Sequence, residues 1–220
     1  MAVSRQSAHP FAPDEILGVA IGTPNPDNTQ QRHVGLIYRI DDSGPRLCHL
    51  AWHFMLKDEP LPADYFWGSS GLDPVNKVFM AAYVASLKRN ASDVPYGIDY
   101  GGIYFDDQGR YIVQPLGRGL TCATFILAVF TRNGFDLLET ESWLERPDDV
   151  EWQQQIISVL DRYASREHIE AVKQNVRAKR FRPEEVAAGV ISENIPLDFS
   201  AAYALAQEIL QDMYGSSPIR

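Results

Sequence analysis

Residues 117–130, with the sequence GRGLTCATFILAVF, decide the fold of this chain of 220 residues. The stretch is rich in glycine up to Thr121 and apolar from Ala123 onward, so it predicts a loop that turns into a buried helix at Cys122. Free backbone N–H groups and the positive end of the helix dipole favour an anion such as a thiolate in the first turn of a helix. A cysteine in an apolar helix is more often an unreactive side chain of the core. The glycine-rich loop that precedes Cys122, however, is expected to leave its thiol accessible to a substrate. The segment therefore predicts a nucleophile at Cys122 with a lowered thiol pKa.

Strand signals come before this helix and predict a small antiparallel sheet. Residues 16–22 are apolar and contain glycine, which is typical of a buried strand. Residues 33–40 and 46–53 are two further strand candidates, and the turn chemistry of residues 41–45 (DDSGP) predicts that they form a hairpin. Two prolines and a glycine–serine patch predict a loop over residues 57–71.

Helix signals surround the cysteine segment and dominate the last third of the chain. Asp73-Pro74 predicts the capped start of a helix that ends near Asn90, and Asn133-Gly134 predicts the end of the Cys122 helix. Further helices are expected from Pro147 and over residues 166–179, 183–188 and 199–213. The expected class is α+β, with a small antiparallel sheet packed on the cysteine-bearing helix. We expect a catalytic domain over residues 1–142 and a helical C-terminal extension over residues 143–220.

Composition and charge indicate which classes of partner the protein does not favour and where in the cell it is located. Hydrophobic residues make up 45% of the chain and charged residues 22%, as in ordinary globular proteins, and the formal charge is −9. That charge disfavours nucleic acids and anionic membranes, and the basic stretch over residues 173–182 is interpreted as a solvated helix face. With two cysteines, no visible secretory signal and no apolar span, the expected location is cytoplasmic as synthesised. Export without a cleaved signal is compatible with the same observations.

Two histidines of the expected hairpin are the candidate partners of the thiol. His33 opens its strand directly after a polar loop, and a neutral imidazole there can take the thiol proton. Side chains alternate along a strand, so a turn centred near Ser43 puts His33, His49 and His53 on one face, with His53 opposite His33. Either His49 or His53 can then orient the base, and the uncertain turn geometry leaves both open.

Cys48, His49 and His53 also raise the alternative of a metal site. Cys48 and His49 are adjacent on the expected strand and point to opposite faces, so they cannot easily bind one ion, and a fourth ligand has no evident source. We therefore expect no metal and no organic cofactor.

The histidine hairpin resembles that of NlpC-type papain-like cysteine hydrolases. The matching residues are His33-Val34-Gly35-Leu36-Ile37-Tyr38, a turn, and Arg46-Leu47-Cys48-His49-Leu50-Ala51. Both histidines precede the cysteine, an order similar to the circularly permuted branch that includes YiiX-type hydrolases and lecithin retinol acyltransferase-like proteins. Tyr96-Gly97 and Tyr100-Gly101-Gly102 are both similar to a tyrosine–glycine segment beside the nucleophile in that family. Thr121-Cys122-Ala123-Thr124-Phe125 departs from the family's Asp-Cys-Ser-Gly and Asn-Cys-Glu motifs. The resemblance implies that His33 pairs with Cys122 and that His49, rather than His53, orients His33.

Together these patterns predict a cysteine peptidase or amidase, a thiol hydrolase that works through an acyl-enzyme. Cys122 is the expected nucleophile, His33 the base and His49 the orienting residue, with the backbone N–H of Cys122 in the oxyanion hole. The resemblance implies a peptide, protein isopeptide bond, cell-wall peptide or lipid ester as substrate, and the acidic charge and missing membrane anchor favour the peptide or amide. An acyltransferase or lipid esterase of the same fold and a non-catalytic binding module are the alternatives. An antibacterial effector is compatible with the missing signal.

Overall fold

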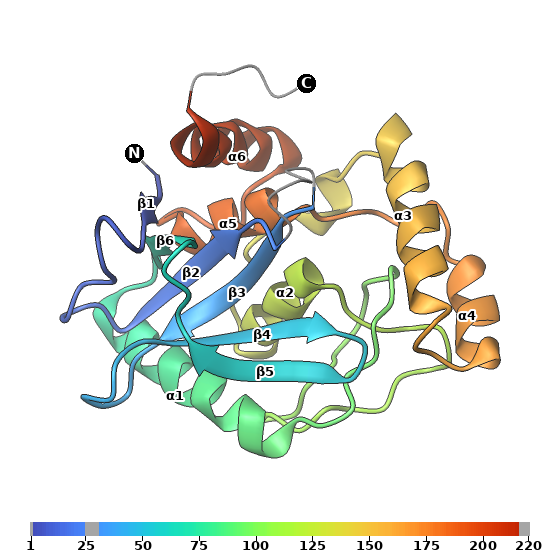
Figure 1. Ribbon diagram of the computed structural model, residues 1–220, viewed down its shortest axis with the longest axis horizontal. Helices are drawn as coiled ribbons and strands as arrows, with labels where there is room; N and C mark the ends of the chain where they lie inside the picture. The colour runs from blue at the N-terminus through green and yellow to red at the C-terminus, as the bar shows by residue number, and fades with distance from the viewer. Residues whose placement is uncertain (1, 25–30, 216–220) are drawn as a thin grey trace.

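The computed structural model describes residues 2–24 and 31–215, which form an antiparallel sheet with helices behind it, above it and at its right in the view of Figure 1. The strands are β1 (Ser4–Arg5), β2 (Leu17–Gly22), β3 (His33–Tyr38), β4 (Arg46–Trp52), β5 (Met55–Pro60) and β6 (Phe66–Ser69). They form one six-stranded sheet in the order β1-β6-β2-β3-β4-β5, and each neighbouring pair runs antiparallel. The helices are α1 (Pro74–Asn90), α2 (Cys122–Arg132), α3 (Pro147–Leu160), α4 (Arg166–Lys173), α5 (Pro183–Ile191) and α6 (Phe199–Tyr214), with a 3-10 turn at Thr140–Ser142. The expected α+β class with a small antiparallel sheet is confirmed.

The two faces of the sheet have different neighbours. On one face, Val34, Leu36 and Leu50 belong to the main hydrophobic core, which includes α1 and α2. Both helices lie behind the sheet in the view of Figure 1. Ile37 and Leu47 alternate with these residues along β3 and β4 and belong to a smaller apolar cluster on the opposite face. The main core is therefore on the helical side of the sheet, and that side carries the cysteine-bearing helix.

Capping side chains fix where the two helices behind the sheet begin. Asp73 accepts hydrogen bonds from the backbone N–H groups of Val75 and Asn76, and Pro74 occupies the first helical position. Thr121 and Thr124 form a reciprocal capping box at the start of α2. Both starts agree with the predictions from sequence.

The C-terminal helices pack in two places. α3 and α4 pack through Ile157 and Ile169 in a small cluster that also includes Tyr96 and Ile98. Val186 and Ala187 of α5 instead belong to the same core as the sheet. In Figure 1, α3 and α4 stand at the right of the molecule, and α5 and α6 lie at the top. The division of the chain at residues 142 and 143 stays a prediction.

Three expectations about local structure are wrong. Residues 57–71 were expected to form a loop but contain most of β5 and all of β6, because the edge strand β5 is rich in charge and lacks an apolar signature. The helix expected over residues 166–179 ends at Lys173. The hairpin register is offset by two residues, since Leu36 faces Cys48 and the turn is centred on residue 42 instead of Ser43. An offset of two keeps every side chain on its predicted face.

Among residues 2–24 and 31–215, no helix combines the length and the apolar character that crossing a membrane requires.

Candidate active site

The candidate site lies where β3 and β4 separate. The two strands pair only between Leu36–Tyr38 and Arg46–Cys48, although β4 continues to pair with β5 as far as Trp52. Figure 1 shows the strands diverging, with α2 behind the gap. A cavity of about 150 Å³ occupies this region, and its lining includes His33, Trp52 and Cys122. The sheet therefore has a gap between β3 and β4 at this end, and the predicted nucleophile and the predicted base both line the cavity there.

Cys122 is the first residue of α2 and is held there by the capping box. The hydroxyl of Thr121 accepts a hydrogen bond from Thr124 N at 3.1 Å, and the hydroxyl of Thr124 accepts one from Thr121 N at 2.7 Å. The backbone N–H groups of Val34, Ala123 and Cys122 itself lie close enough to the thiol to lower its pKa. Because Val34 belongs to β3, the sulfur bridges the start of the helix and the open edge of that strand.

The glycine-rich loop before Cys122 packs so closely against its neighbours that residues with a side chain cannot replace Gly117 and Gly119. A Cβ at Gly119 would lie 2.5 Å from the carbonyl oxygen of Pro95, and Gly117 adopts a φ of +83°. This close approach lets Tyr96 form a parallel bridge with Leu120, immediately before the capping residue. The Tyr96-Gly97 segment therefore lies beside the nucleophile.

His53 holds this neighbouring segment and does not contact His33. His53 Nδ1 accepts a hydrogen bond from Tyr96 N at 3.1 Å, and His168 Nε2 lies 2.9 Å from Tyr96 O. The two imidazoles thus bind the backbone N–H and the backbone C=O of the same residue, Tyr96, and their ring centroids lie 5.1 Å apart. Of the two histidines left open by the sequence, the structure brings His49 to His33.

His33, His49 and Glu59 form a chain of hydrogen bonds. His33 Nε2 lies 2.6 Å from His49 Nδ1, and His49 Nε2 lies 3.1 Å from Glu59 Oε1. A carboxylate only accepts, so His49 donates from Nε2 and accepts at Nδ1, and His33 must donate from Nε2. The unprotonated nitrogen of His33 is then Nδ1, the atom that a general base needs. Three residues from three adjacent strands therefore fix one tautomer.

Glu59 was missed because the sequence predicted a loop at its position. The usable signal was the alternation of β5, in which Lys57 and Glu59 share a face and Lys57 is the register partner of His49. Gly35 also belongs to this arrangement, since a Cβ there would lie 2.7 Å from the Cβ of His49. The glycine provides the space that the histidine pair occupies.

Both predicted catalytic groups are neutral in the free protein. Burial raises the pKa of the Cys122 thiol to about 11, although the three backbone N–H groups act in the opposite direction and lower it. Burial, with His49 and Lys57 as smaller causes, lowers the pKa of His33 to about 3. Burial also lowers the pKa of His49, although Glu59 acts in the opposite direction. The expectation of a lowered thiol pKa at Cys122 is therefore wrong, because the loss of solvent outweighs the helix start.

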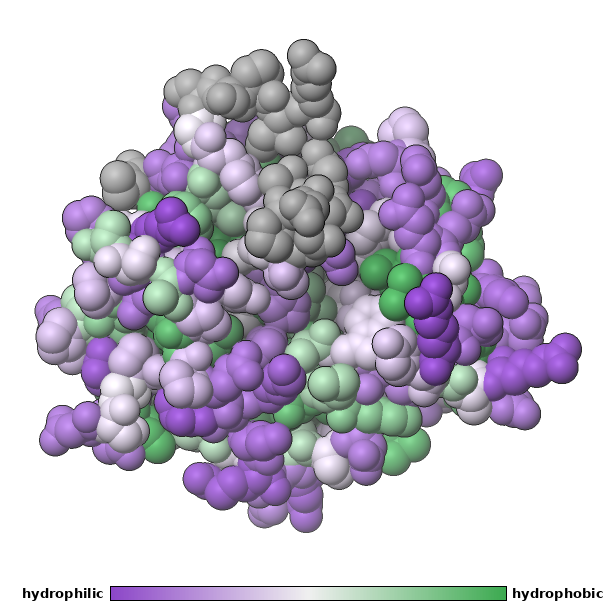
Figure 2. Space-filling model, viewed as in Figure 1, coloured by the Kyte–Doolittle hydropathy of each residue, from purple (hydrophilic) through white to green (hydrophobic). Residues whose placement is uncertain are grey.

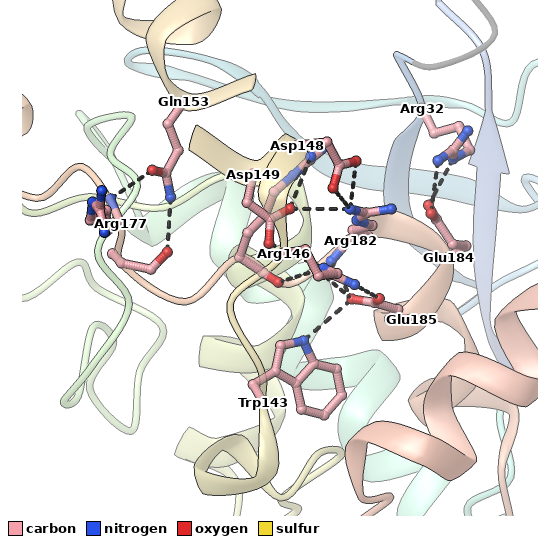
Figure 3. A network of polar contacts seen from close by, with 12 residues as sticks. Arg32, Trp143, Arg146, Asp148, Asp149, Gln153, Arg177, Arg182, Glu184 and Glu185 are labelled. Carbon is pink, nitrogen blue, oxygen red and sulfur yellow. Dashed lines mark hydrogen bonds and ion pairs between the residues drawn. The ribbon is translucent and has the colours of Figure 1, made fainter. Parts of the chain in front are cut away.

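Arginines and carboxylates border the cavity on the side of α3 and α5. Figure 3 shows Arg182 reaching Asp148, Arg32 reaching Glu184, and Arg146 close to Glu185. The interpretation of residues 173–182 as a solvated helix face is wrong, since Arg180 and Arg182 come after α4 and their side chains are only 11% and 19% exposed. These arginines can be buried because they pair with carboxylates from distant segments of the chain. Such pairing cannot be predicted from the local sequence.

The surface above the site is less polar than its surroundings. Pale residues gather between the end of β4 and α3, whereas hydrophilic residues dominate much of the rim (Figure 2). The lining of the cavity is also largely aromatic on that side, with Trp52, Tyr96, Trp152 and Phe181. Aromatic walls and a few polar groups are typical of a ligand pocket.

No group of three or more His, Cys, Asp and Glu side chains in the described part of the chain is arranged to hold a metal ion. Comparisons with family models, curated proteins and solved structures found no match to this chain.

Proposed function

We propose that this protein is a thiol hydrolase of the papain-like type that cleaves an amide or peptide bond through Cys122. The observation that carries the proposal is the chain of hydrogen bonds from Glu59 through His49 to His33, which assigns the proton of His33 to Nε2 beside the cavity that Cys122 also lines. The start of α2 and the hairpin histidines supply the parts of such an enzyme in the order that the sequence predicted. A peptide, protein or cell-wall fragment is the proposed partner.

The proposed reaction starts from a neutral thiol and a neutral imidazole. As the sulfur attacks the substrate carbonyl, His33 Nδ1 takes the thiol proton and the carbonyl oxygen becomes an oxyanion. The bond to the leaving amine breaks when His33 returns that proton to the nitrogen, which leaves a thioester on Cys122. Water then attacks the thioester with His33 as base, and the acid product and the thiol are released. His49 and Glu59 hold His33 in the competent tautomer throughout.

The start of α2 offers donors for the oxyanion. The N–H groups of Cys122 and Ala123 lower the pKa of the thiol and, as first-turn groups of the helix, have no intrahelical acceptor. Such donors stabilise the developing charge by about 3 kcal/mol each in enzymes of this kind. No metal or organic cofactor is needed for these steps.

Hydrolysis assays with Cys122→Ala as control test the function. Peptidoglycan fragments, ubiquitin-like conjugates and phospholipids cover the amide, isopeptide and ester classes. We expect turnover of an amide or peptide substrate by the wild type and none by Cys122→Ala. Release of fatty acid from phospholipid alone would instead favour the lipid esterase or acyltransferase of the same fold.

A second candidate is a non-catalytic binding module that keeps the fold. The raised pKa of Cys122, about 11, favours this candidate, because a structural thiol has no need of a thiolate. The two candidates differ in how Cys122 reacts. In a hydrolase its alkylation depends on His33 near neutral pH, whereas in a binding module the His33→Ala variant reacts as fast as the wild type.

A further inference from the structure

Arg180 shares the cavity with the predicted nucleophile. Its side chain is 11% exposed and lies among the lining residues together with Cys122, Trp52 and Trp152. The guanidinium carbon lies 4.0 Å from the centroid of the Trp152 ring, so the planar group stacks on that wall. Its positive charge also lowers the pKa of Cys122 against the effect of burial. A cation is thus present in the cavity within electrostatic range of the sulfur.

The other arginines of this region have carboxylates of their own. These pairs are Arg32 with Glu184, Arg182 with Asp148, and Arg146 with Glu185. Among the carboxylates of the described residues, Arg180 reaches only that of Asp149, at 3.3 Å. Asp149 is also contacted by Arg146 at 3.1 Å and by Arg182 at 3.2 Å. Three guanidinium groups therefore share one carboxylate, and Arg180 is the most distant of them.

Arg180 and Trp52 both line the cavity, and each carries N–H groups without an acceptor within residues 2–24 and 31–215. Arg180 uses only Nη1, toward Asp149, out of the five N–H donors of a guanidinium. Trp52, another wall of the cavity, has an indole Nε1 that is shielded from solvent and has no hydrogen-bond partner. Unpaired donors next to an aromatic wall favour the binding of an acceptor, and a carboxylate supplies up to four lone pairs.

We propose that this cavity is a subsite for a carboxylate of the substrate, which Arg180 binds with the help of Trp52 beside Cys122. The proposal rests on the thiol hydrolase function and names its substrate class: amides or peptides with a free carboxylate close to the bond that is cleaved. A volume of about 150 Å³ is smaller than the pockets of about 300–1,000 Å³ that hold whole ligands. It therefore suits one short acidic group, such as an acidic side chain or a chain-terminal carboxylate, of a larger molecule.

A pair of alkylating reagents tests this subsite without a known substrate. Iodoacetate and iodoacetamide differ only in the carboxylate, and both form a bond from the sulfur to their CH₂ carbon, expel iodide and release the thiol proton to His33 or solvent. We expect the ratio of the iodoacetate rate to the iodoacetamide rate at Cys122 to exceed that of glutathione by about tenfold. Mass spectrometry of the labelled peptide separates Cys122 from the buried Cys48.

Variants locate the effect in the cavity. The ratio should fall about tenfold in Arg180→Gln and recover partly in Arg180→Lys, which restores the charge. Trp52→Phe keeps an aromatic wall, removes the unpaired N–H and should lower the ratio severalfold even if Arg180→Gln does not fold. Arg110→Gln makes the same change of net charge at an exposed ion pair with Asp106 and should leave the ratio unchanged.

The carboxylate subsite and the thiol hydrolase function would be contradicted by different results. A wild-type ratio equal to that of glutathione, or equal ratios in the wild type, Arg180→Gln and Trp52→Phe, would overturn the carboxylate subsite. An iodoacetamide rate that does not depend on His33 would overturn the hydrolase proposal, whatever the ratio of the two reagents.

Discussion

At the scale of single residues, the proposed function depends on which nitrogen of His33 carries a proton. Glu59 and His49 act in series, so that an edge strand determines the tautomer of a residue two strands away. The thiol is neutral as well, since burial raises its pKa to about 11. The site therefore favours proton transfer during attack over an ion pair that exists beforehand.

We predict that the reactivity of Cys122 depends on His33 near neutral pH. At pH 7 iodoacetamide should label Cys122 about a hundredfold faster in the wild type than in His33→Ala, because the imidazole removes the proton as the sulfur attacks. The difference should shrink as the pH approaches the pKa of the thiol, about 11, where the thiolate forms without help. Equal rates at pH 7 would remove His33 from the mechanism.

Glu59→Gln should slow turnover while the fold is kept. The amide replaces an acceptor-only carboxylate and can donate to His49, which would reverse the donors along the chain and leave a proton on His33 Nδ1. We expect kcat for an activated ester to fall about tenfold with KM unchanged. The control is Glu141→Gln, which makes the same exchange on a side chain that is 92% exposed. A change in KM alone would indicate a binding role for Glu59.

At the scale of elements, the hairpin and the cysteine-bearing helix could be predicted because their signals are local. Asp73-Pro74 and Thr121 mark helix starts through their own side chains, and the turn chemistry of residues 41–45 marks the hairpin. β5 could not be predicted, because an edge strand exposes charged residues such as Glu59 and has little apolar pattern. The burial of Arg180 depends on packing between distant segments, which no local signal describes.

Gly35→Ala tests how the hairpin makes room for the histidine pair. The new Cβ would lie 2.7 Å from the Cβ of His49, which forces the strands apart, so we expect a loss of about 1–3 kcal/mol in the free energy of unfolding. Reactivity of Cys122 should fall with it, as His49 moves away from His33. Urea denaturation measures the first effect and iodoacetamide labelling the second. Gly101→Ala, where a Cβ would meet no atom within 4 Å, should stay within about 0.5 kcal/mol of the wild type.

At the scale of the whole molecule, burying these neutral groups couples folding to pH. Between about pH 3 and 6.5 the unfolded chain binds a proton at residue 33 that the folded protein does not bind. Stability must therefore rise with pH through this window, by up to about 1.4 kcal/mol per pH unit from this residue. Cys122 acts at the other end, because the folded protein keeps the thiol proton between about pH 9 and 11 and stability falls as pH rises there.

A comparison of the wild type with His33→Asn isolates the acidic part of this dependence. Urea denaturation at pH 6.5 and 4.5 should show the wild type losing about 2–3 kcal/mol more than the variant. Identical losses in the two proteins would mean that His33 is not buried in its neutral form.

The formation of an acyl-enzyme tests the nucleophile and its base together. With p-nitrophenyl acetate we expect a burst of about one p-nitrophenol per protein molecule, an acetyl group mapped to Cys122 by mass spectrometry, a much slower burst in His33→Ala and none in Cys122→Ala. Acetylation confined to lysines, or a burst of equal rate in all three proteins, would contradict the account.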